Sequence, residues 1–530
     1  VSKMVRNGTL RAARYTVVSK GLVNMSYLRI LMVALFVLTP VVAFSEDDRP
    51  NILVIMADDL GFADVGCFGS EIQTPNLDKL ARNGLRFTQF YNTAKCHSSR
   101  VCLLTGLYSN QAGQETLRHG VTTAQVLRDA GYFTAMTGKW HLRDQPTDHG
   151  FDRYWGHLSG ATSFFTGDDS FRLNGETWDV PNDQDFYVTT ANTDYAIRFI
   201  DEAKTTDKPL YLYMAFNAPH YPLHCLEEDY RLYEETYKVG WDVIRKQRQN
   251  KQQQLGLFGE AYLTPAPRPG HVFAWESLTD EERDWESQRM AAYAAMVHRM
   301  DLAIGGVIEH LRANDMLDNT LVLFVSDNGA CPFDRTRGKE HRPWDPKSYW
   351  CYSPGWAHVG NTPFRLYKQN QHEGGITSPA IAHWPAGLKA EQGSTTDQPA
   401  HLIDVMPTLV ELGRATYPEN DHQGEVEPMQ GASLVPIFGG ETRQPYPMFF
   451  RFAENRAVRV GDNKLVSFRG SPWELYDLSK DRTELNNLAS ENPAMVTMLS
   501  ETWHHWAEHV NRMPEKQRRP VRKTQQKANF

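Results

Sequence analysis

Four side chains that could bind a hard metal ion stand in two widely separated places of the sequence. They are Asp58, Asp59, Asp327 and Asn328, and each pair comes at the end of a short apolar segment. All four offer oxygen atoms, which suit calcium or magnesium, whereas zinc sites take histidine and cysteine. Calcium accepts looser geometry than magnesium, and a site assembled from two distant strand ends is of that looser kind. These residues therefore predict one calcium ion.

Basic side chains follow two other apolar segments. Lys139 and His141 come after one of them, and His220 comes after the other. Taken singly, an acidic pair after a strand more often caps a helix or shapes a turn, and Lys139 or His141 would be a surface residue. If these were only caps or surface residues, oxygen ligands would have no reason to follow two strands while cations follow two other strands of the same sheet. The four segments together predict a site for a metal ion and an anion.

Cys96 opens a segment, Cys96 to Gly106, that follows Phe90 to Thr93 and is typical of a loop entering a helix. A cysteine near a helix N-terminus has a lowered thiol pKa, and the helix end favours anions. From the residues alone, two interpretations stay open: a cysteine nucleophile and a buried structural cysteine.

Short apolar runs without alternation indicate strands that are buried on both faces of a mostly parallel sheet. The runs are Ile52 to Ala57, Tyr132 to Met136, Leu210 to Phe216, Leu321 to Val325 and Pro379 to Trp384. Ligand sites in such sheets form beyond the carboxyl ends of the strands. The residues that could do chemistry come at these ends, which predicts an α/β enzyme.

Helical patterns separate the runs. Thr74 to Gly84 has the start and stop signals of a helix, and Glu286 to Arg312 carries an apolar stripe at helical spacing that predicts core packing. Between them, Glu227 to Glu286 is rich in Gln, Arg, Lys, Tyr and Pro. We interpret it as a surface insertion, either a wall over a site or a solvated helix and loop.

The elements group into a large catalytic domain over residues 46–440 and a small subdomain over residues 441–513. In the subdomain, short runs with turns precede an amphipathic helix between Pro493 and Asn511, which predicts an antiparallel sheet with a covering helix. Residues 514–530 are strongly basic and nearly free of apolar side chains, as in a disordered tail.

Residues 1–45 have the layout of an export signal. Basic residues precede the apolar run 30–44, which Pro40 interrupts, and Ala43 and Ser45 have the spacing of a cleavage site. The alternative is an uncleaved anchor. We predict an exported protein, periplasmic or extracellular, without stable membrane insertion once the signal is removed.

Composition sets further limits. The 530 residues carry a formal net charge of −8, so nothing favours nucleic acid as a partner, and an anion must be bound by a local basic site. Six scattered cysteines are too few for a disulfide scaffold in a chain of this length.

The sequence resembles the type I sulfatases, which depend on formylglycine, and within them the bacterial arylsulfatases. Eight segments carry this resemblance in order along the chain: Asn51 to Asp59, Thr74 to Asp78, Cys96 to Arg100 with Leu103 to Gly106, Gly138 to His141, Ala218 to His220, Ser326 to Gly329, His372 to Gly375 and Trp473 to Leu478. The resemblance implies an alkaline-phosphatase-like α/β fold. This fold has a large, mostly parallel sheet flanked by helices and a small C-terminal α+β subdomain.

The resemblance also implies that Cys96 is oxidised to formylglycine by a maturation enzyme. One hydroxyl of the hydrated aldehyde would attack sulfur, and the other would later eject sulfate, which avoids a second attack at sulfur. Calcium would hold Cys96, in its modified form, and the sulfate oxygens. Arg100, Lys139 and Lys368 would balance the shifting charge.

By the same resemblance, His141 takes the proton that triggers sulfate release. His220, with Lys368, would protonate the departing alcohol, and Asp327 would act as a base on the attacking hydroxyl. The substrate would be a small-molecule or carbohydrate sulfate ester.

Two features of the site stay open at this point. A hydroxyl that contacts sulfate is expected from Ser159, Thr162 or Ser163, without a choice among them. The maturation motif of the family usually has proline two residues after the cysteine, where this chain has Ser98. Two other functions remain as alternatives: a phosphate or phosphonate ester hydrolase of the same fold, and a catalytically silent binder of sulfated glycans.

Overall fold

The computed structural model describes residues 48–181, 185–259, 263–421 and 424–511. From Arg49 onward these residues form one compact unit. The predicted signal 1–45 and the predicted tail 514–530 lie outside the described residues. In the described part, no helix combines the length and the apolar character that crossing a membrane requires.

A large mixed sheet forms the centre of the molecule. Its strands run in the order β10, β2, β9, β8, β1, β7, β3, β4, β5 and β6, and β11 pairs with β2. The strands span Asn51–Ala57 (β1), Leu85–Tyr91 (β2), Phe133–Lys139 (β3), Arg153–His157 (β4), Phe171–Leu173 (β5), Glu176–Thr177 (β6), Leu210–Ala215 (β7), Thr320–Ser326 (β8), Thr377–His383 (β9), Ser394–Thr396 (β10) and Ala400–His401 (β11). The five central strands run parallel to one another, in the order β8, β1, β7, β3 and β4. This confirms the prediction of a mostly parallel sheet.

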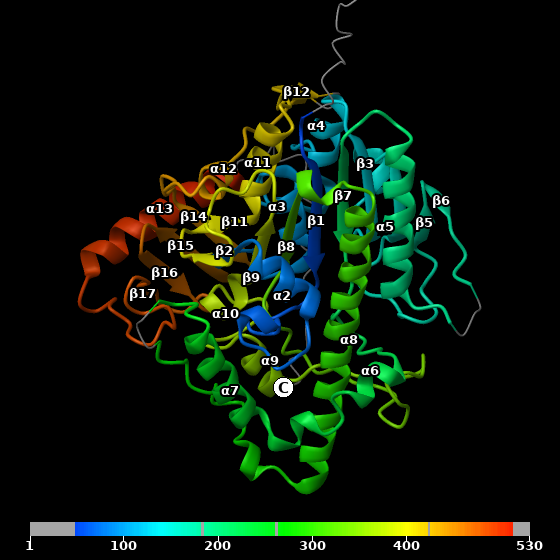
Figure 1. Ribbon diagram of the computed structural model, residues 1–530. Coiled ribbons are helices and arrows are strands. Elements are labelled where there is room, and N and C mark those ends of the chain that lie inside the picture. Colours follow the sequence, from blue (N-terminus) through cyan, green and yellow to red (C-terminus); the bar gives the residue numbers. More distant parts are fainter. Residues whose placement is uncertain (1–47, 182–184, 260–262, 422–423, 512–530) are drawn as a thin grey trace, which may run out of the picture. The chain divides into compact units, whose positions relative to one another are not determined.

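Helices cover both faces of this sheet (Figure 1). Alternate residues of β1 enter two separate hydrophobic clusters, because successive side chains of a strand point to opposite faces. Leu53 and Ile55 belong to a cluster that includes residues of α2 (Pro75–Arg82), α5 (Val188–Lys204) and α8 (Asp280–Ala313). Ile52 and Val54 belong to a second cluster, which includes residues of α3 (Cys96–Thr105), α4 (Thr123–Asp129), α11 (Val405–Leu412) and α13 (Pro493–Asn511). Burial on both faces explains why the strand has no polar alternation.

Three details of the sheet differ from the sequence prediction. Strand β3 continues through Lys139, so this residue ends the strand and does not follow it. Strand β9 is antiparallel to both β8 and β2. Strand β2, which ends at Phe90 and Tyr91, was not predicted, because Arg86, Thr88 and Gln89 interrupt its apolar side chains.

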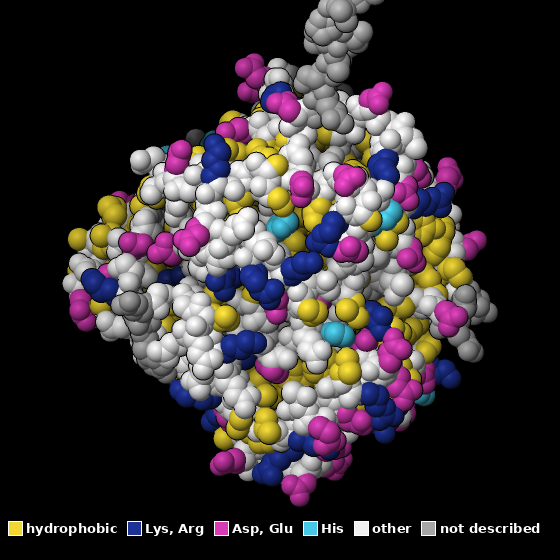
Figure 2. Space-filling model, viewed as in Figure 1, with side chains coloured by type: hydrophobic (Ala, Val, Ile, Leu, Met, Phe, Trp, Pro, Cys, Tyr) yellow, Lys and Arg dark blue, Asp and Glu magenta, His cyan; other side chains and the backbone are white. Residues whose placement is uncertain are grey.

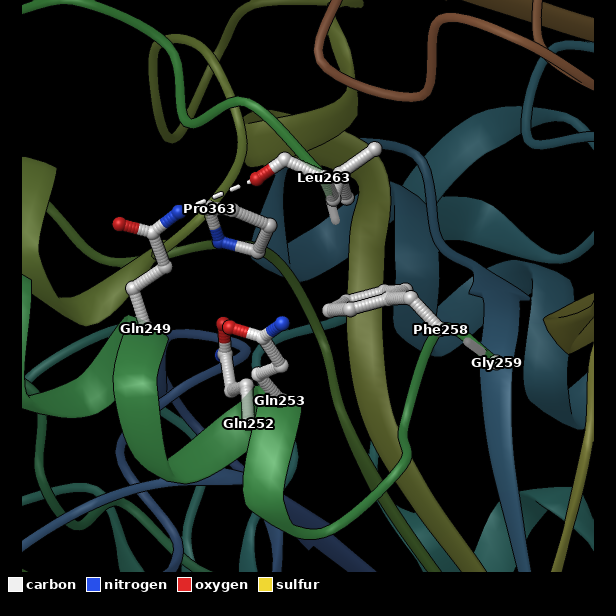
Figure 3. Close-up of a pocket in the computed structure, with 7 residues that line it drawn as sticks. All are labelled: Gln249, Gln252, Gln253, Phe258, Gly259, Leu263 and Pro363. Atoms are coloured by element: carbon white, nitrogen blue, oxygen red, sulfur yellow. Dashed lines mark hydrogen bonds between the residues drawn. The ribbon is translucent and has the colours of Figure 1, made fainter. Parts of the chain in front are cut away.

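The predicted surface insertion is partly buried. It contains α6 (Glu227–Arg231) and α7 (Trp241–Gln254), and α7 buries Arg245 and Arg248 along with Trp241 and Ile244. Arg248 forms ion pairs with Asp64 and Glu71 at 2.5 and 2.8 Å. Gln249 donates to the Leu263 carbonyl at 3.0 Å beside a small pocket, shown in Figure 3, that is lined by Gln249, Gln252, Gln253, Phe258, Gly259, Leu263 and Pro363. Helix α7 therefore buries one polar face by pairing, whereas its other face, with Lys246, Gln247 and Asn250, is exposed to solvent as one of the two interpretations expected.

The C-terminal part forms the predicted antiparallel sheet. Its strands are β14 (Met448–Phe452), β15 (Asn455–Val460), β16 (Asn463–Ser467) and β17 (Glu474–Asp477), and α13 ends at the predicted Asn511. The described residues also form the short α-helices α9 (Pro354–Gly360), α10 (Glu373–Ile376) and α12 (Val435–Phe438). All six cysteines are buried free thiols.

A buried ion cluster joins this small sheet to the large one. The Lys464 ammonium donates to Glu373 Oε1 at 2.8 Å and lies 2.8 Å from Glu484 Oε1, the latter as an ion pair without hydrogen-bond geometry. Arg482 reaches the other oxygen of Glu373 at 3.1 Å. Burial would raise the pKa of Glu373, but Lys464 and Arg482 outweigh it and lower this pKa to about 2.

Replacing Lys464 with methionine should strongly destabilise the protein. The change leaves two buried carboxylates with too little positive charge, a situation that costs about 3–5 kcal/mol. The loss is measured as the free energy of unfolding in urea. Lys480→Met is the control, since Lys480 forms an exposed pair with Asp477, and it should leave that free energy nearly unchanged. Equal effects of the two changes would contradict the assigned role of the cluster.

Charges of both signs are interspersed over the face shown in Figure 2. Lysine and arginine side chains alternate there with aspartate and glutamate, in agreement with the small net charge of −8. No field of a single sign covers this face, so anion binding on it depends on local groups.

Candidate active site

The ends of four neighbouring strands bring the predicted residues to one edge of the sheet. The register pairs Ala57 of β1 with Ser326 of β8, so Asp58 and Asp327 leave the sheet side by side. Backbone bonds fix these exits: Asp327 N donates to the Ala57 carbonyl, and Asp58 N donates to the Ala218 carbonyl, both at 3.1 Å. The segment after β7, which carries His220, is thereby tied to the end of β1.

Three buried oxygen atoms of the predicted metal ligands have no hydrogen-bond partner among the residues that the structure describes. They are Oδ1 of Asp58, Oδ2 of Asp59 and Oδ1 of Asn328. Ligand atoms of Asp58, Asp59, Cys96 and His220 all lie within 4.8 Å of one another. Buried polar atoms in folded proteins are nearly always satisfied, so three free oxygens in one place indicate a site for a cation. The donor set is of the hard oxygen type that calcium takes.

Asp327 contacts this cluster, and both of its carboxylate oxygens accept hydrogen bonds. Its Oδ1 accepts from Asp59 N at 3.2 Å, and its Oδ2 accepts from Arg100 Nη2 at 3.1 Å. Asn328 Nδ2 donates to Asp59 Oδ1 at 2.6 Å. The structure therefore gathers all four predicted oxygen ligands, and Asp327 links them to Arg100.

Cations surround the carboxylates. Lys139 pairs with Asp58, and Lys368 pairs with Asp59 and donates to Cys96 Sγ at 3.0 Å. Gly138 is needed to deliver Lys139, because its φ is +93° and a Cβ there would lie 2.1 Å from the Ala215 carbonyl oxygen. The site combines fixed positive charge with metal-type oxygens, an arrangement that suits an anionic substrate.

These charges separate the pKa values of the three aspartates. Burial raises the pKa of both Asp58 and Asp59. At Asp58 the positive charges of Lys139, His220 and Arg100 outweigh the effect of burial. At Asp59 the positive charges of Lys368 and His220 outweigh it. Both pKa values fall below the ordinary range. Burial and the charge of Asp58 raise the pKa of Asp327 to about 7 despite Arg100.

Two histidines border the cluster. His220 Nδ1 lies 2.7 Å from the Tyr221 carbonyl, which can only accept, so Nδ1 carries a proton and Nε2 faces Asp59 Oδ2 at 3.5 Å. Burial lowers the pKa of His220 to about 4. His141 has a left-handed backbone with φ of 58°, and no group in the described part of the chain bonds its buried Nδ1. Burial, Lys139 and Arg100 lower its pKa.

Cys96 is the first residue of α3, as predicted, but its acidity differs from the expectation. Burial raises the pKa of the thiol, although Lys368 acts in the opposite direction. The helix N-terminus therefore does not yield a low thiol pKa here. Cys96 is nearly inaccessible and lies against Lys368 within the ligand cluster.

The three candidate hydroxyls have different partners. Ser159 Oγ donates to Asp168 at 2.7 Å, and Ser163 Oγ accepts from the amides of Phe165 and Thr166. Thr162 Oγ1 is buried without a partner. Of the three, Thr162 alone has an unused hydroxyl among the residues that the structure describes.

Some groups next to the site were missed from the sequence. Tyr293 belongs to the stripe predicted as core, and its ring does stack on Tyr352, but its hydroxyl contacts the Asp59 carbonyl at 3.3 Å and Asp64 Oδ2 at 2.8 Å. The ring of His97 lies 6.0 Å from that of His141. The adjacency of His97 to Cys96 in the sequence was the available signal.

Comparisons with known proteins agree with the geometry. A sulfatase family model matches residues 50–415, and a model of the N-sulphoglucosamine sulphohydrolase C-terminal region matches residues 364–510. An uncharacterized sulfatase of Schizosaccharomyces pombe is 33% identical over 527 residues, covering 87% of this chain and 93% of the relative. An arylsulfatase of Klebsiella aerogenes is 32% identical over 444 residues, covering 74% and 93%. The crystal structure of Ps i-CgsB in complex with k-i-k-neocarrahexaose has a TM-score of 0.65 at 25% identity, covering 88% of this chain and 94% of that one.

Proposed function

The chain belongs to the sulfatase family of sulfuric ester hydrolases, and we propose that it cleaves aryl or carbohydrate sulfate monoesters with a formylglycine made from Cys96 and one calcium ion. The products would be inorganic sulfate and an alcohol. The observation that carries this proposal is the set of free buried oxygens on Asp58, Asp59 and Asn328 beside Cys96.

The residues present fit both groups. Asp58, Asp59, Asp327 and Asn328 would hold calcium, and residue 96 would complete the ligand set. Bound calcium would polarise the sulfate ester and stabilise negative charge on its oxygens. Formylglycine, as its hydrate, supplies a hydroxyl nucleophile with a second hydroxyl on the same carbon.

The fixed cations orient and stabilise the anionic substrate. Lys139, Lys368 and Arg100 are buried, and each is paired with one of the carboxylates, so their positions are set before the substrate arrives. Preorganised charge of this kind stabilises a transition state without reorganisation during the reaction. We assign a sulfate contact to Thr162 because its buried hydroxyl has no other partner in the described part of the chain.

Proton transfer falls to the histidines. His220 Nε2 faces the ligand cluster while Nδ1 is held by the Tyr221 carbonyl, so Nε2 is the atom that would protonate the departing alcohol oxygen. This step requires the imidazolium form of His220, which the negative charge of Asp58, Asp59 and a bound sulfate ester favours against the effect of burial. We assign His141 to the proton transfer that accompanies sulfate release, and Asp327 to a base role at the nucleophile.

Export and maturation complete the proposal. We propose that residues 1–45 direct export to the periplasm or the extracellular space, and that a maturation enzyme modifies Cys96 before folding buries it. Cys96 is 1% exposed in the folded chain, which favours modification of the unfolded segment.

A comparison of three substrates distinguishes sulfate ester hydrolysis from the alternative, phosphate or phosphonate ester hydrolysis. The purified protein is tested on 4-nitrophenyl sulfate, 4-nitrophenyl phosphate and a phenylphosphonate ester under equal conditions. We expect sulfate release with the highest kcat/KM. A higher kcat/KM on the phosphate or phosphonate ester would favour the alternative.

Replacing His220 with alanine should harm poor leaving groups most. A sugar sulfate needs protonation of its alcohol oxygen, so its kcat/KM should fall by about 100-fold or more, the usual contribution of a general acid. Activated 4-nitrophenyl sulfate needs little protonation and should lose much less. Equal losses on both substrates would assign His220 to another task.

A further inference from the structure

Two arginines without a carboxylate partner lie on the loop next to His220. Arg335 and Arg337 are exposed, and neither forms an ion pair with any carboxylate that the structure describes. The Arg335 guanidinium lies 4.8 Å from the ring centroid of Tyr221. That of Arg337 lies 5.1 Å from the ring centroid of Tyr349, and it also donates to the Tyr221 hydroxyl at 3.4 Å. Two free cations thus converge on one tyrosine.

This tyrosine ties the two arginines to the candidate active site. Tyr221 follows His220 in the chain, and its carbonyl holds His220 Nδ1 at 2.7 Å. Tyr221 and Phe333 line the same small pocket as Asp59. Arg335 and Arg337 therefore contact the residue whose carbonyl orients His220, the histidine assigned to the departing alcohol.

The loop holds both arginines in place. Arg337 and Tyr349 exchange two backbone hydrogen bonds, at 3.1 and 3.0 Å, and Arg335 N donates to Cys351 Sγ at 3.3 Å. The neighbouring Asp334 is already paired with Arg289 at 2.6 Å, so it does not neutralise them. A guanidinium that lies over an aromatic ring keeps its N–H groups available at the edge for a planar, bidentate anion.

We propose that Arg335 and Arg337 bind a second anionic group of the substrate, on the alcohol side of the sulfate ester that is cleaved. This inference rests on the proposed sulfatase function and narrows its substrate class. The alcohol product carries a negative charge of its own, either a further sulfate ester or a carboxylate. A polyanionic sugar has this chemistry, whereas a simple aryl sulfate does not.

The double variant Arg335→Gln/Arg337→Gln tests the subsite. Four substrates are compared: 4-nitrophenyl sulfate, a sugar with one sulfate, the same sugar with two sulfates, and the same monosulfate with a carboxylate. We expect kcat/KM for the doubly charged sugars to fall by about tenfold or more, the usual loss when hydrogen bonds to a charged group are removed. The singly charged substrates should change by less than about twofold, because they do not reach the arginines.

Arg342→Gln is the matched control. Arg342 is exposed on the same loop and donates to Gln288 at 3.2 Å, so its loss removes one positive charge without touching Tyr221. It should leave all four kcat/KM values nearly unchanged. If a sugar binds without being cleaved, its Ki as an inhibitor of 4-nitrophenyl sulfate hydrolysis is compared among the wild type, the double variant and Arg342→Gln instead of kcat/KM.

The outcomes separate the two proposals. A loss confined to the disulfated sugar, or to the carboxylate sugar, identifies which anion the arginines bind, and both results support the subsite. Equal changes on singly and doubly charged substrates would overturn the subsite while leaving the sulfatase function intact. No sulfate ester hydrolysis by the wild-type protein on any of the four substrates would overturn the function itself.

Discussion

Replacing Cys96 with alanine lowers kcat for sulfate ester hydrolysis by about 10⁴-fold or more, the scale of loss when a covalent nucleophile is removed. The cause is local. Cys96 is buried in the ligand cluster against Lys368, and no second cysteine joins it in the metal-type cluster found among the described residues. The rate is measured with 4-nitrophenyl sulfate at saturating concentration.

Cys102→Ala is the control for this change. Cys102 is buried on the same helix, α3, but packs in the hydrophobic cluster on one face of the sheet. Its replacement should lower the free energy of unfolding by about 1 kcal/mol, the usual cost of a small core truncation, with kcat preserved. If Cys96→Ala kept an appreciable fraction of the wild-type kcat, residue 96 would not be the nucleophile.

Removing divalent metal with a chelator lowers activity by about 100-fold or more, because several kcal/mol of transition-state stabilisation are lost with the ion. Calcium should restore activity better than zinc, since the ligands of Asp58, Asp59 and Asn328 are oxygens. Binding is followed independently as a calcium-dependent rise in Tm.

The variant Asn328→His tests whether Asn328 is a calcium ligand. Asn328→His replaces an oxygen ligand by nitrogen at the end of an intact strand, so it should weaken calcium binding and leave the fold unchanged. Asp301→Asn is the control, since Asp301 is a buried carboxylate on α8 that accepts from the Asn76 and Leu77 amides away from the site. Its calcium-dependent rise in Tm should match that of the wild type. Restoration of activity by zinc alone would contradict a calcium site.

The sequence predicted the site because parallel strands end at a common edge. The runs before Asp58, His220 and Asp327 are uniformly apolar, and their buried positions in the sheet require this. Residues far apart in the chain were therefore placed together without knowledge of contacts. Lys368, assigned from the family resemblance, also reaches the cluster and contacts Cys96.

The sequence could not show which polar residues are buried. Arg248 of α7 is fully buried because Asp64 and Glu71 accept its hydrogen bonds, and those partners lie far away in the chain. Composition alone favoured a solvated surface for this segment. Strand β2 was missed for a related reason, since Arg86 and Gln89 find partners, Cys67 and Arg459, that come from other elements.

The convergence of Arg335 and Arg337 on Tyr221 was equally hidden. A loop with several charges usually indicates solvent exposure, and it does so here. Only the folded chain shows that two of these cations border His220 without a carboxylate partner among the described residues. The positions of these arginines depend on the conformation of a loop, and sequence patterns predict loop conformations less well than helices and strands.

Mass spectrometry of the tryptic peptide Cys96 to Arg100 tests the central claim most directly. Cleavage after Lys95 and Arg100 isolates this segment. In protein from its native source, the peptide should have lost one sulfur and two hydrogen atoms and gained one oxygen, and it should react with an aldehyde reagent. In a foreign host, conversion should be partial and should rise with Ser98→Pro, since position 98 lies in the first turn of α3, where proline is tolerated. An intact Cys96 thiol in native protein that still cleaves sulfate esters would contradict the formylglycine mechanism, and an intact thiol without cleavage would favour the silent sulfated-glycan binder.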